Sequence, residues 1–88
     1  MSYKLKLHKK AKKFLLSREL KDREKIIKKL EQLQQEPVYN EKLDIAKLKG
    51  YDNRYRLRVN SYRIIYEIYN SLITIYILDI GNRGDIYK

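Results

Sequence analysis

The sequence predicts a single α+β domain in which an N-terminal strand and a pair of helices pack on a small antiparallel sheet. Apolar residues alternate with charged ones over residues 3–8, recur at helical spacing up to residue 36, and alternate again from residue 51 onward. One face of the sheet must then receive the helices. A chain of 88 residues fits one domain, so residues 1–88 are assigned to a single unit.

The first strand and the first helix are expected in the lysine-rich N-terminal segment. Residues 3–8 predict a short strand with one buried face, because tyrosine and leucine alternate there with lysine and histidine. Ala11, Phe14 and Leu15 follow at helical spacing and predict a short amphipathic helix. The strand is expected at the far side of the sheet, because pairing with the next strand in sequence would cross its own helices.

A second helix is expected between Asp22 and Pro37. Asp22 is the predicted N-cap, because a carboxylate there accepts hydrogen bonds from the N–H groups of the first turn. Pro37 ends the helix, since proline has no N–H to continue it. The predicted apolar stripe of this helix consists of Ile26, Ile27, Leu30 and Leu33.

Residues 38–50 are predicted to be a connection, and a meander of three antiparallel strands follows it. The strands are expected over residues 51–59, 62–69 and 72–79, where the alternation has a period of two. Asn60-Ser61 and Asn70-Ser71 are the predicted turns, because asparagine tolerates the left-handed backbone that such turns need. The connection has apolar anchors at Leu43, Ile45 and Leu48, and its turn is Gly50.

The two-residue turn fixes the register of the first hairpin. Arg58 then lies opposite Arg63, and Arg54 lies opposite Glu67, which can neutralise it. Arg58 and Arg63 have no such acidic neighbour, and facing like charges destabilise a strand pair. We therefore expect an anion between them; the alternative is that both side chains extend into water. The basic face carries Arg54, Arg56, Arg58, Arg63 and Glu67, and the apolar face carries Tyr55, Leu57, Val59, Tyr62, Ile64, Tyr66 and Ile68.

The distribution of positive charge indicates where an anion is held. The net charge is +10, which favours a polyanionic partner such as nucleic acid or a ribosome, although a solvated lysine surface is the alternative reading. Residues 1–50 carry thirteen lysines and two arginines, whereas residues 51–88 carry five arginines and one lysine. Arginine binds phosphate bidentately through a planar fork. The C-terminal half is therefore the predicted phosphate-binding region.

Several kinds of site are not expected. The chain has no cysteine and a single histidine, His8, which argues against a metal site and against a histidine pair for acid–base catalysis. The glycines are too dispersed for a phosphate loop. We expect no metal and no cofactor. Neither a signal peptide nor a long apolar run is visible, which favours a cytoplasmic protein without a membrane partner.

The C-terminal tail contributes two further candidates, Arg83 and Tyr87. A tyrosine near an arginine-lined face can stack on a base or accept a proton. The phenol pKa lies near 10, too high for a good base at neutral pH, but neighbouring arginines lower it by stabilising the phenolate. A packing residue at a frayed end is the alternative for Tyr87.

The chain resembles the RelE family of type II toxins from toxin–antitoxin pairs. The similarity extends over nearly the whole chain, including its length and the order of its elements. Four segments carry it: Lys47-Leu48-Lys49-Gly50, Tyr55-Arg56-Leu57-Arg58-Val59, Tyr62-Arg63-Ile64-Ile65-Tyr66-Glu67, and Gly81-Asn82-Arg83 with Asp85-Ile86-Tyr87.

The resemblance implies a ribosome-dependent endoribonuclease that cleaves mRNA in the A site of the 30S subunit. In that chemistry the ribose 2′-hydroxyl attacks the adjacent phosphate without a metal. Arg63 and Arg83 match arginines that stabilise the transition state, and Arg83 is also the candidate general acid. Tyr87 matches the tyrosine that stacks on the nucleotide and is the candidate general base. Arg56 and Arg58 stand where relatives often have lysines, so they are assigned, with Arg54, to RNA phosphate binding.

The resemblance also implies a cognate RelB-like antitoxin, which is expected to form a hetero-oligomer with the toxin. The free toxin is expected to be a monomer, because a monomer best suits the A site. Leu16, Val38 and Leu72 are candidate antitoxin anchors. Two other functions remain open on the residues alone. One is a ParE-like toxin that inhibits a topoisomerase, and the other is an RNA- or ribosome-binding module without catalysis.

Overall fold

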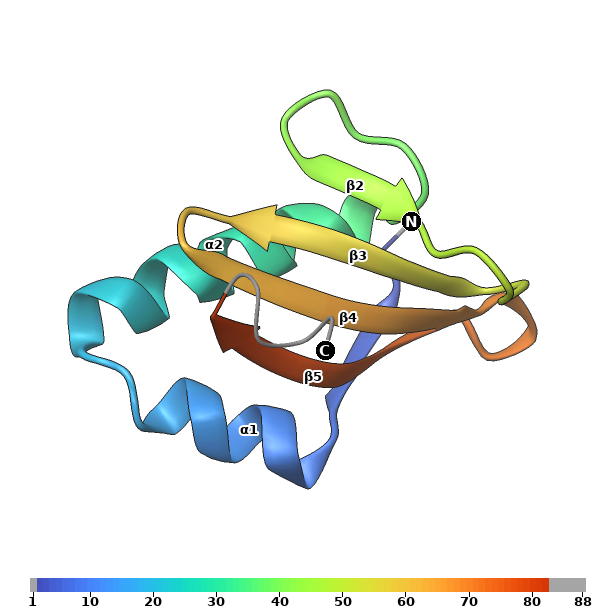
Figure 1. The fold of residues 1–88 in the computed structure, drawn as a ribbon. Helices are drawn as coiled ribbons and strands as arrows, with labels where there is room; N and C mark the ends of the chain where they lie inside the picture. Colours follow the sequence, from blue (N-terminus) through green and yellow to red (C-terminus); the bar gives the residue numbers. More distant parts are fainter. Residues whose placement is uncertain (1, 83–88) are drawn as a thin grey trace.

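The computed structural model describes residues 2–82 as a five-stranded sheet with two helices on one face, as Figure 1 shows. The sheet order is β1-β5-β4-β3-β2, with β1 parallel to β5 and every other pair antiparallel. The predicted α+β fold is confirmed, and the first strand does pair at the far side of the sheet. The elements are β1 (Lys4–Leu7), α1 (Lys9–Leu16), α2 (Leu20–Gln35), β2 (Asp44–Lys47), β3 (Arg54–Val59), β4 (Tyr62–Tyr69), a 3-10 turn (Asn70–Leu72) and β5 (Thr74–Asn82).

The connection after α2 contains a strand, β2, that was not predicted. β2 pairs with β3, so that Asp44 lies opposite Arg58 and Ile45 opposite Leu57. Its four residues are too few for a clear alternation, and only Leu43 and Ile45, two positions apart, hinted at it. The predicted turn at Gly50 is confirmed, since its φ of +86° lies in the left-handed region that favours glycine.

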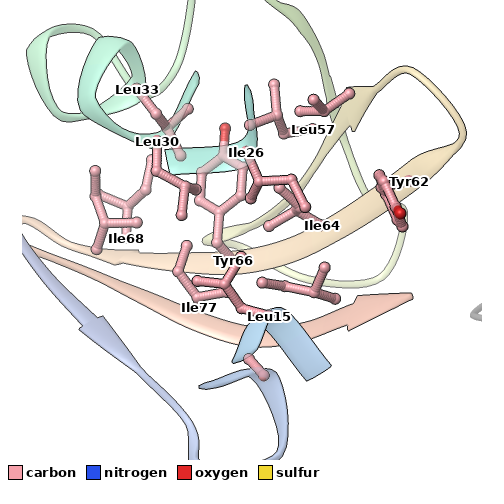
Figure 2. Close-up of a cluster of buried hydrophobic side chains, with 14 residues drawn as sticks. Leu15, Ile26, Leu30, Leu33, Leu57, Tyr62, Ile64, Tyr66, Ile68 and Ile77 are labelled. Atoms are coloured by element: carbon pink, nitrogen blue, oxygen red, sulfur yellow. The ribbon is translucent and has the colours of Figure 1, made fainter. Parts of the chain in front are cut away.

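The core lies between the helices and one face of the sheet (Figure 2). Ile26 and Leu33 are fully buried there, and Leu30 is nearly so. Ile27 was wrongly included in this stripe, because it is 44% exposed. The predicted N-cap was also wrong: α2 begins after Glu19, and Asp22 lies in its first turn.

Asp22 in α2 and Pro37 just after it each accept a hydrogen bond from a tyrosine of β4. The Tyr62 hydroxyl donates to the Asp22 carboxylate over 2.7 Å, and this bond is the main cause of a raised pKa for Tyr62. The buried Tyr66 hydroxyl donates to the Pro37 carbonyl over 2.6 Å, and burial raises the pKa of Tyr66. Pro37 thus ends the helix, as predicted, and also satisfies a hydroxyl inside the core.

The hairpin of β3 and β4 has the predicted register at every pair from Val59–Tyr62 to Arg54–Glu67. Asn60 takes the left-handed backbone of the turn, with φ of 53°. The second turn is longer than predicted, because a 3-10 turn and a left-handed Ile73 precede β5. β5 therefore begins at Thr74 and extends to Asn82. Its pairing with β4 has a register shift between Ile65 and Tyr66, two neighbouring residues of β4.

Within residues 2–82, no helix is long and apolar enough to cross a membrane.

Candidate RNA-binding site

The four arginines of β3 and β4 lie on the sheet face that is turned away from the helices. Strand alternation puts them there, because Leu57, Val59 and Ile64 occupy the core between them. Arg56 is 6% exposed and Arg63 8% exposed. Of the two facing arginines for which extension into water was the alternative, Arg63 is therefore buried, whereas the Arg58 side chain is 38% exposed. We call Arg56, Arg58 and Arg63 the arginine cluster. Burial makes it more than a diffuse basic surface.

Arg54 is committed to an internal ion pair. Its Nη2 lies 2.7 Å and its Nε 3.0 Å from Glu67 Oε2, as the register predicted. The hydrogen bond to Glu67 is the main cause of a raised pKa for Arg54. Burial opposes ionisation of Glu67, but hydrogen bonds from Tyr69 and Arg54 outweigh it and lower the pKa of Glu67. Arg54 therefore holds Glu67 ionised, which leaves it less available to RNA phosphate than the arginine cluster.

Asp44 of β2 is an acidic partner of the arginine cluster that was not predicted. One carboxylate oxygen lies 3.5 Å from Arg56 Nη2, and the other lies 3.8 Å from Arg58 Nη1. The expectation that Arg58 has no acidic neighbour was therefore wrong, because it missed β2. Both distances are long for a charged hydrogen bond, and the Asp44 side chain is 57% exposed. The contact is loose enough for a stronger anion to replace it.

Two donor atoms of the arginine cluster point to an external anion. Arg56 Nη1 and Arg58 Nε are buried, and neither has a hydrogen-bond partner among residues 2–82. Such donors are rare in native proteins, because each costs about 1–3 kcal/mol when it is unsatisfied. A phosphate group offers several acceptor oxygens to neighbouring guanidinium groups. The arrangement therefore suits a phosphate bound between β3 and β4.

Arg63 lies at the end of the sheet next to the β3–β4 turn. Arg63 lies opposite Arg58 on one side and opposite Gly81 on the other. Gly81 adds no side chain beside it, and β5 continues to Asn82, opposite Tyr62. Arg83 and Tyr87 lie outside the described residues. In residues 2–82 no group of three His, Cys, Asp or Glu side chains is placed to hold a metal ion.

Arg58→Ala is expected to leave thermal stability unchanged or slightly improved while weakening RNA binding. The change removes the like charge opposite Arg63, and it loses only the 3.8 Å contact to an exposed Asp44. Thermal unfolding together with RNA-binding titration checks it. A clear loss of stability with unchanged RNA affinity would count against an anion site here.

Comparison with known proteins gives consistent results. The family model described as ParE toxin of the type II toxin–antitoxin system parDE matches residues 5–87. RelE1 of Methanocaldococcus jannaschii is 32% identical over 88 residues, which is 100% of this chain and 98% of that protein. A chain of the archaeal RelE–RelB complex from Pyrococcus horikoshii is 34% identical with a TM-score of 0.83, covering 97% of this chain and 99% of that one. A chain of the RelB–RelE antitoxin–toxin complex from Methanococcus jannaschii is 35% identical with a TM-score of 0.74, covering 93% and 94%.

Proposed function

Because this chain belongs to the RelE family of type II toxins, we propose that it is a ribosome-dependent endoribonuclease that cleaves mRNA in the A site. The observation that carries the proposal is the arginine cluster with its buried, unsatisfied donors on Arg56 and Arg58. Such donors match a phosphate diester better than they match a protein carboxylate alone. Cleavage of mRNA on ribosomes stops translation, and it requires the protein to be in the cytoplasm.

The proposed reaction is attack by a ribose 2′-oxygen on the adjacent phosphorus. The 2′-oxygen loses its proton, the bond from phosphorus to the 5′-oxygen breaks, and that leaving oxygen takes up a proton. The products are a 2′,3′-cyclic phosphate and a 5′-hydroxyl. Arg63 and Arg83 are proposed to stabilise the negative charge that develops on the phosphate oxygens. Arg56 and Arg58 are proposed to hold the phosphate in place.

Proton transfer is the most demanding part of this mechanism. Arginine in a protein essentially stays protonated, so Arg56 and Arg58 cannot take the proton of the 2′-hydroxyl. Tyr87 is therefore the proposed general base, and it also stacks on the nucleotide. Arg83 is the proposed general acid, acting by a hydrogen bond to the leaving oxygen, with solvent as the final source of the proton.

A RelB-like antitoxin is the proposed protein partner, since two of the similar structures are toxin complexes with RelB. The three anchor positions predicted for it are exposed: Leu16 at 58%, Val38 at 56% and Leu72 at 65%. Exposed apolar side chains of this size are suited to burial by a partner. The free toxin is proposed to be a monomer, which suits entry into the A site.

The proposed function is tested by adding the purified protein to ribosomes programmed with a defined mRNA. Primer extension then maps the 5′ ends. We expect cuts within the A-site codon, and we expect them to disappear with Arg83→Ala or Tyr87→Ala. Intact mRNA under these conditions would reject the proposal.

A ParE-like inhibitor of a DNA topoisomerase is the second candidate, because the matching family model carries the ParE description. The arginine cluster favours RNA cleavage over this candidate, since topoisomerase binding needs no buried phosphate site. A supercoiling assay separates the two if the ribosome assay is negative.

Asp44→Asn is expected to raise the affinity for RNA by about two- to fivefold, because the loose Asp44 contact competes with phosphate for Arg56 and Arg58. The matched control is Glu31→Gln, which removes the same charge from the exposed side of α2. RNA titration at fixed salt measures both variants. Equal gains in the two would attribute the effect to net charge alone.

A further inference from the structure

A second feature of the arginine face is a cavity of about 520 Å³ that Arg54 helps to line. This volume lies within the usual range for small-molecule sites. Its apolar lining includes Ile65 of β4 and Leu78 of β5. The other lining residues are Leu48, Lys49, Tyr51, Arg54 and Asp79. An apolar lining with a few polar groups is suited to a flat, partly polar ligand.

One wall of the cavity is formed by Tyr51 and Arg54, which contact each other. The Arg54 guanidinium carbon lies 4.0 Å from the centre of the Tyr51 ring. Glu67 fixes the same guanidinium by two hydrogen bonds. Guanidinium and tyrosine planes are the surfaces on which proteins stack single-stranded bases. Arg54 was predicted to bind phosphate, but its ion pair and its contact with Tyr51 favour this second role.

The cavity adjoins the arginine cluster, because its lining residue Ile65 lies directly opposite Arg56. Arg56, Ile65 and Asp79 are direct cross-strand neighbours on β3, β4 and β5. Adjacent strands are about 4.8 Å apart, so the row extends about 10 Å from a cation across an apolar side chain to a carboxylate. A nucleotide laid along this row would put its phosphate at the arginines and its base over Ile65.

Asp79 determines which ligand groups can bind at the end of the cavity that lies away from the arginine cluster. Its side chain is 26% exposed, and its one ion pair among residues 2–82 is a 3.4 Å contact to Lys10, which is itself 70% exposed. A carboxylate accepts hydrogen bonds but cannot donate them. It therefore favours a base edge that carries N–H donors. Guanine offers two adjacent donors, N1–H and the 2-amino group, whereas uracil offers only N3–H between two carbonyl oxygens.

We propose that this cavity binds a nucleobase of the RNA whose phosphate occupies the arginine cluster, and that Asp79 selects guanine. The proposal rests on the RNA-binding function proposed above, and it adds a base-recognition site to it. Tyr51 and Arg54 supply stacking for any base. Asp79 supplies the discrimination, since a carboxylate accepting both guanine donors loses one of those bonds with any other base.

The test is titration of the isolated protein with GMP, AMP, CMP and UMP, observed through the methyl NMR signals of Ile65 and Leu78. Inorganic phosphate is the control for anion binding alone. We expect GMP to bind about tenfold more tightly than UMP. Asp79→Asn should remove that preference, whereas Glu31→Gln, on the exposed side of α2, should preserve it. Tyr51→Ala should weaken all four nucleotides by a similar factor.

The outcomes separate this proposal from the proposed function. Equal affinities for the four nucleotides, or a guanine preference that survives Asp79→Asn, would overturn the base site even if A-site cleavage is observed. Conversely, a guanine preference that depends on Asp79 would support the base site even if ribosomes yield no cleavage.

Discussion

Arg63→Ala is expected to lower A-site cleavage by about 10²–10³-fold, the usual loss when one preorganised donor to a developing oxyanion is removed. Arg63 is 8% exposed on the sheet face, opposite Arg58, so its guanidinium is held before RNA binds. A preorganised donor needs no rearrangement during the reaction, which is why its removal slows the chemical step. Single-turnover cleavage on programmed ribosomes measures the effect.

Two variants sharpen the Arg63 experiment. Arg63→Lys keeps the charge but loses the planar fork, so we expect an intermediate rate. Arg18→Ala removes an arginine from the helical side, where it lies 4.4 Å from the Phe14 ring, and should cleave at the normal rate. If Arg63→Ala, folded as judged by circular dichroism, cleaves as fast as Arg18→Ala, Arg63 has no catalytic role.

Ile26→Ala is expected to lower the free energy of unfolding by about 2–5 kcal/mol. The Ile26 side chain is fully buried between α2 and the sheet, so its truncation leaves a cavity in a small core (Figure 2). An 88-residue domain has only about 5–15 kcal/mol of stability, so the loss is a large fraction of the total. Urea denaturation followed by circular dichroism gives the difference.

The neighbouring residue is the matched control for that experiment. Ile27 is 44% exposed, and Ile27→Ala makes the same chemical change one position along the same helix. Its effect should stay within about 0.5 kcal/mol, as for most surface substitutions. Similar losses in the two variants would contradict the packing of α2 described above.

Alternation and one turn were enough to predict the central hairpin. The side-chain period of a strand is two, so a two-residue turn at Asn60-Ser61 fixes both faces and every pair from Val59–Tyr62 to Arg54–Glu67. The same rule predicts that the arginines share one face of the sheet. Local periodicity is enough to assign the faces, because the face on which a side chain lies depends only on its place in the alternation along the strand.

Features that depend on tertiary contacts were not predictable. β2 is four residues long, and its place beside β3 comes from pairing across the fold, so Asp44 was not expected near Arg58. The exposure of Ile27 depends on how α2 rotates against the sheet, which a broad apolar stripe leaves undetermined. The burial of Arg56 and the cavity between Tyr51, Ile65 and Leu78 likewise arise from residues distant in sequence.

The most direct test of the central claim is A-site cleavage of an mRNA with a single 2′-deoxynucleotide on the 5′ side of the scissile phosphate. If the 2′-oxygen is the nucleophile, the all-ribose mRNA is cut to a 2′,3′-cyclic phosphate and a 5′-hydroxyl, and the deoxy-substituted mRNA stays intact at that position. Cleavage of the deoxy-substituted mRNA at the same rate, or products with a 5′-phosphate, would contradict the mechanism proposed for the arginine cluster, Arg83 and Tyr87.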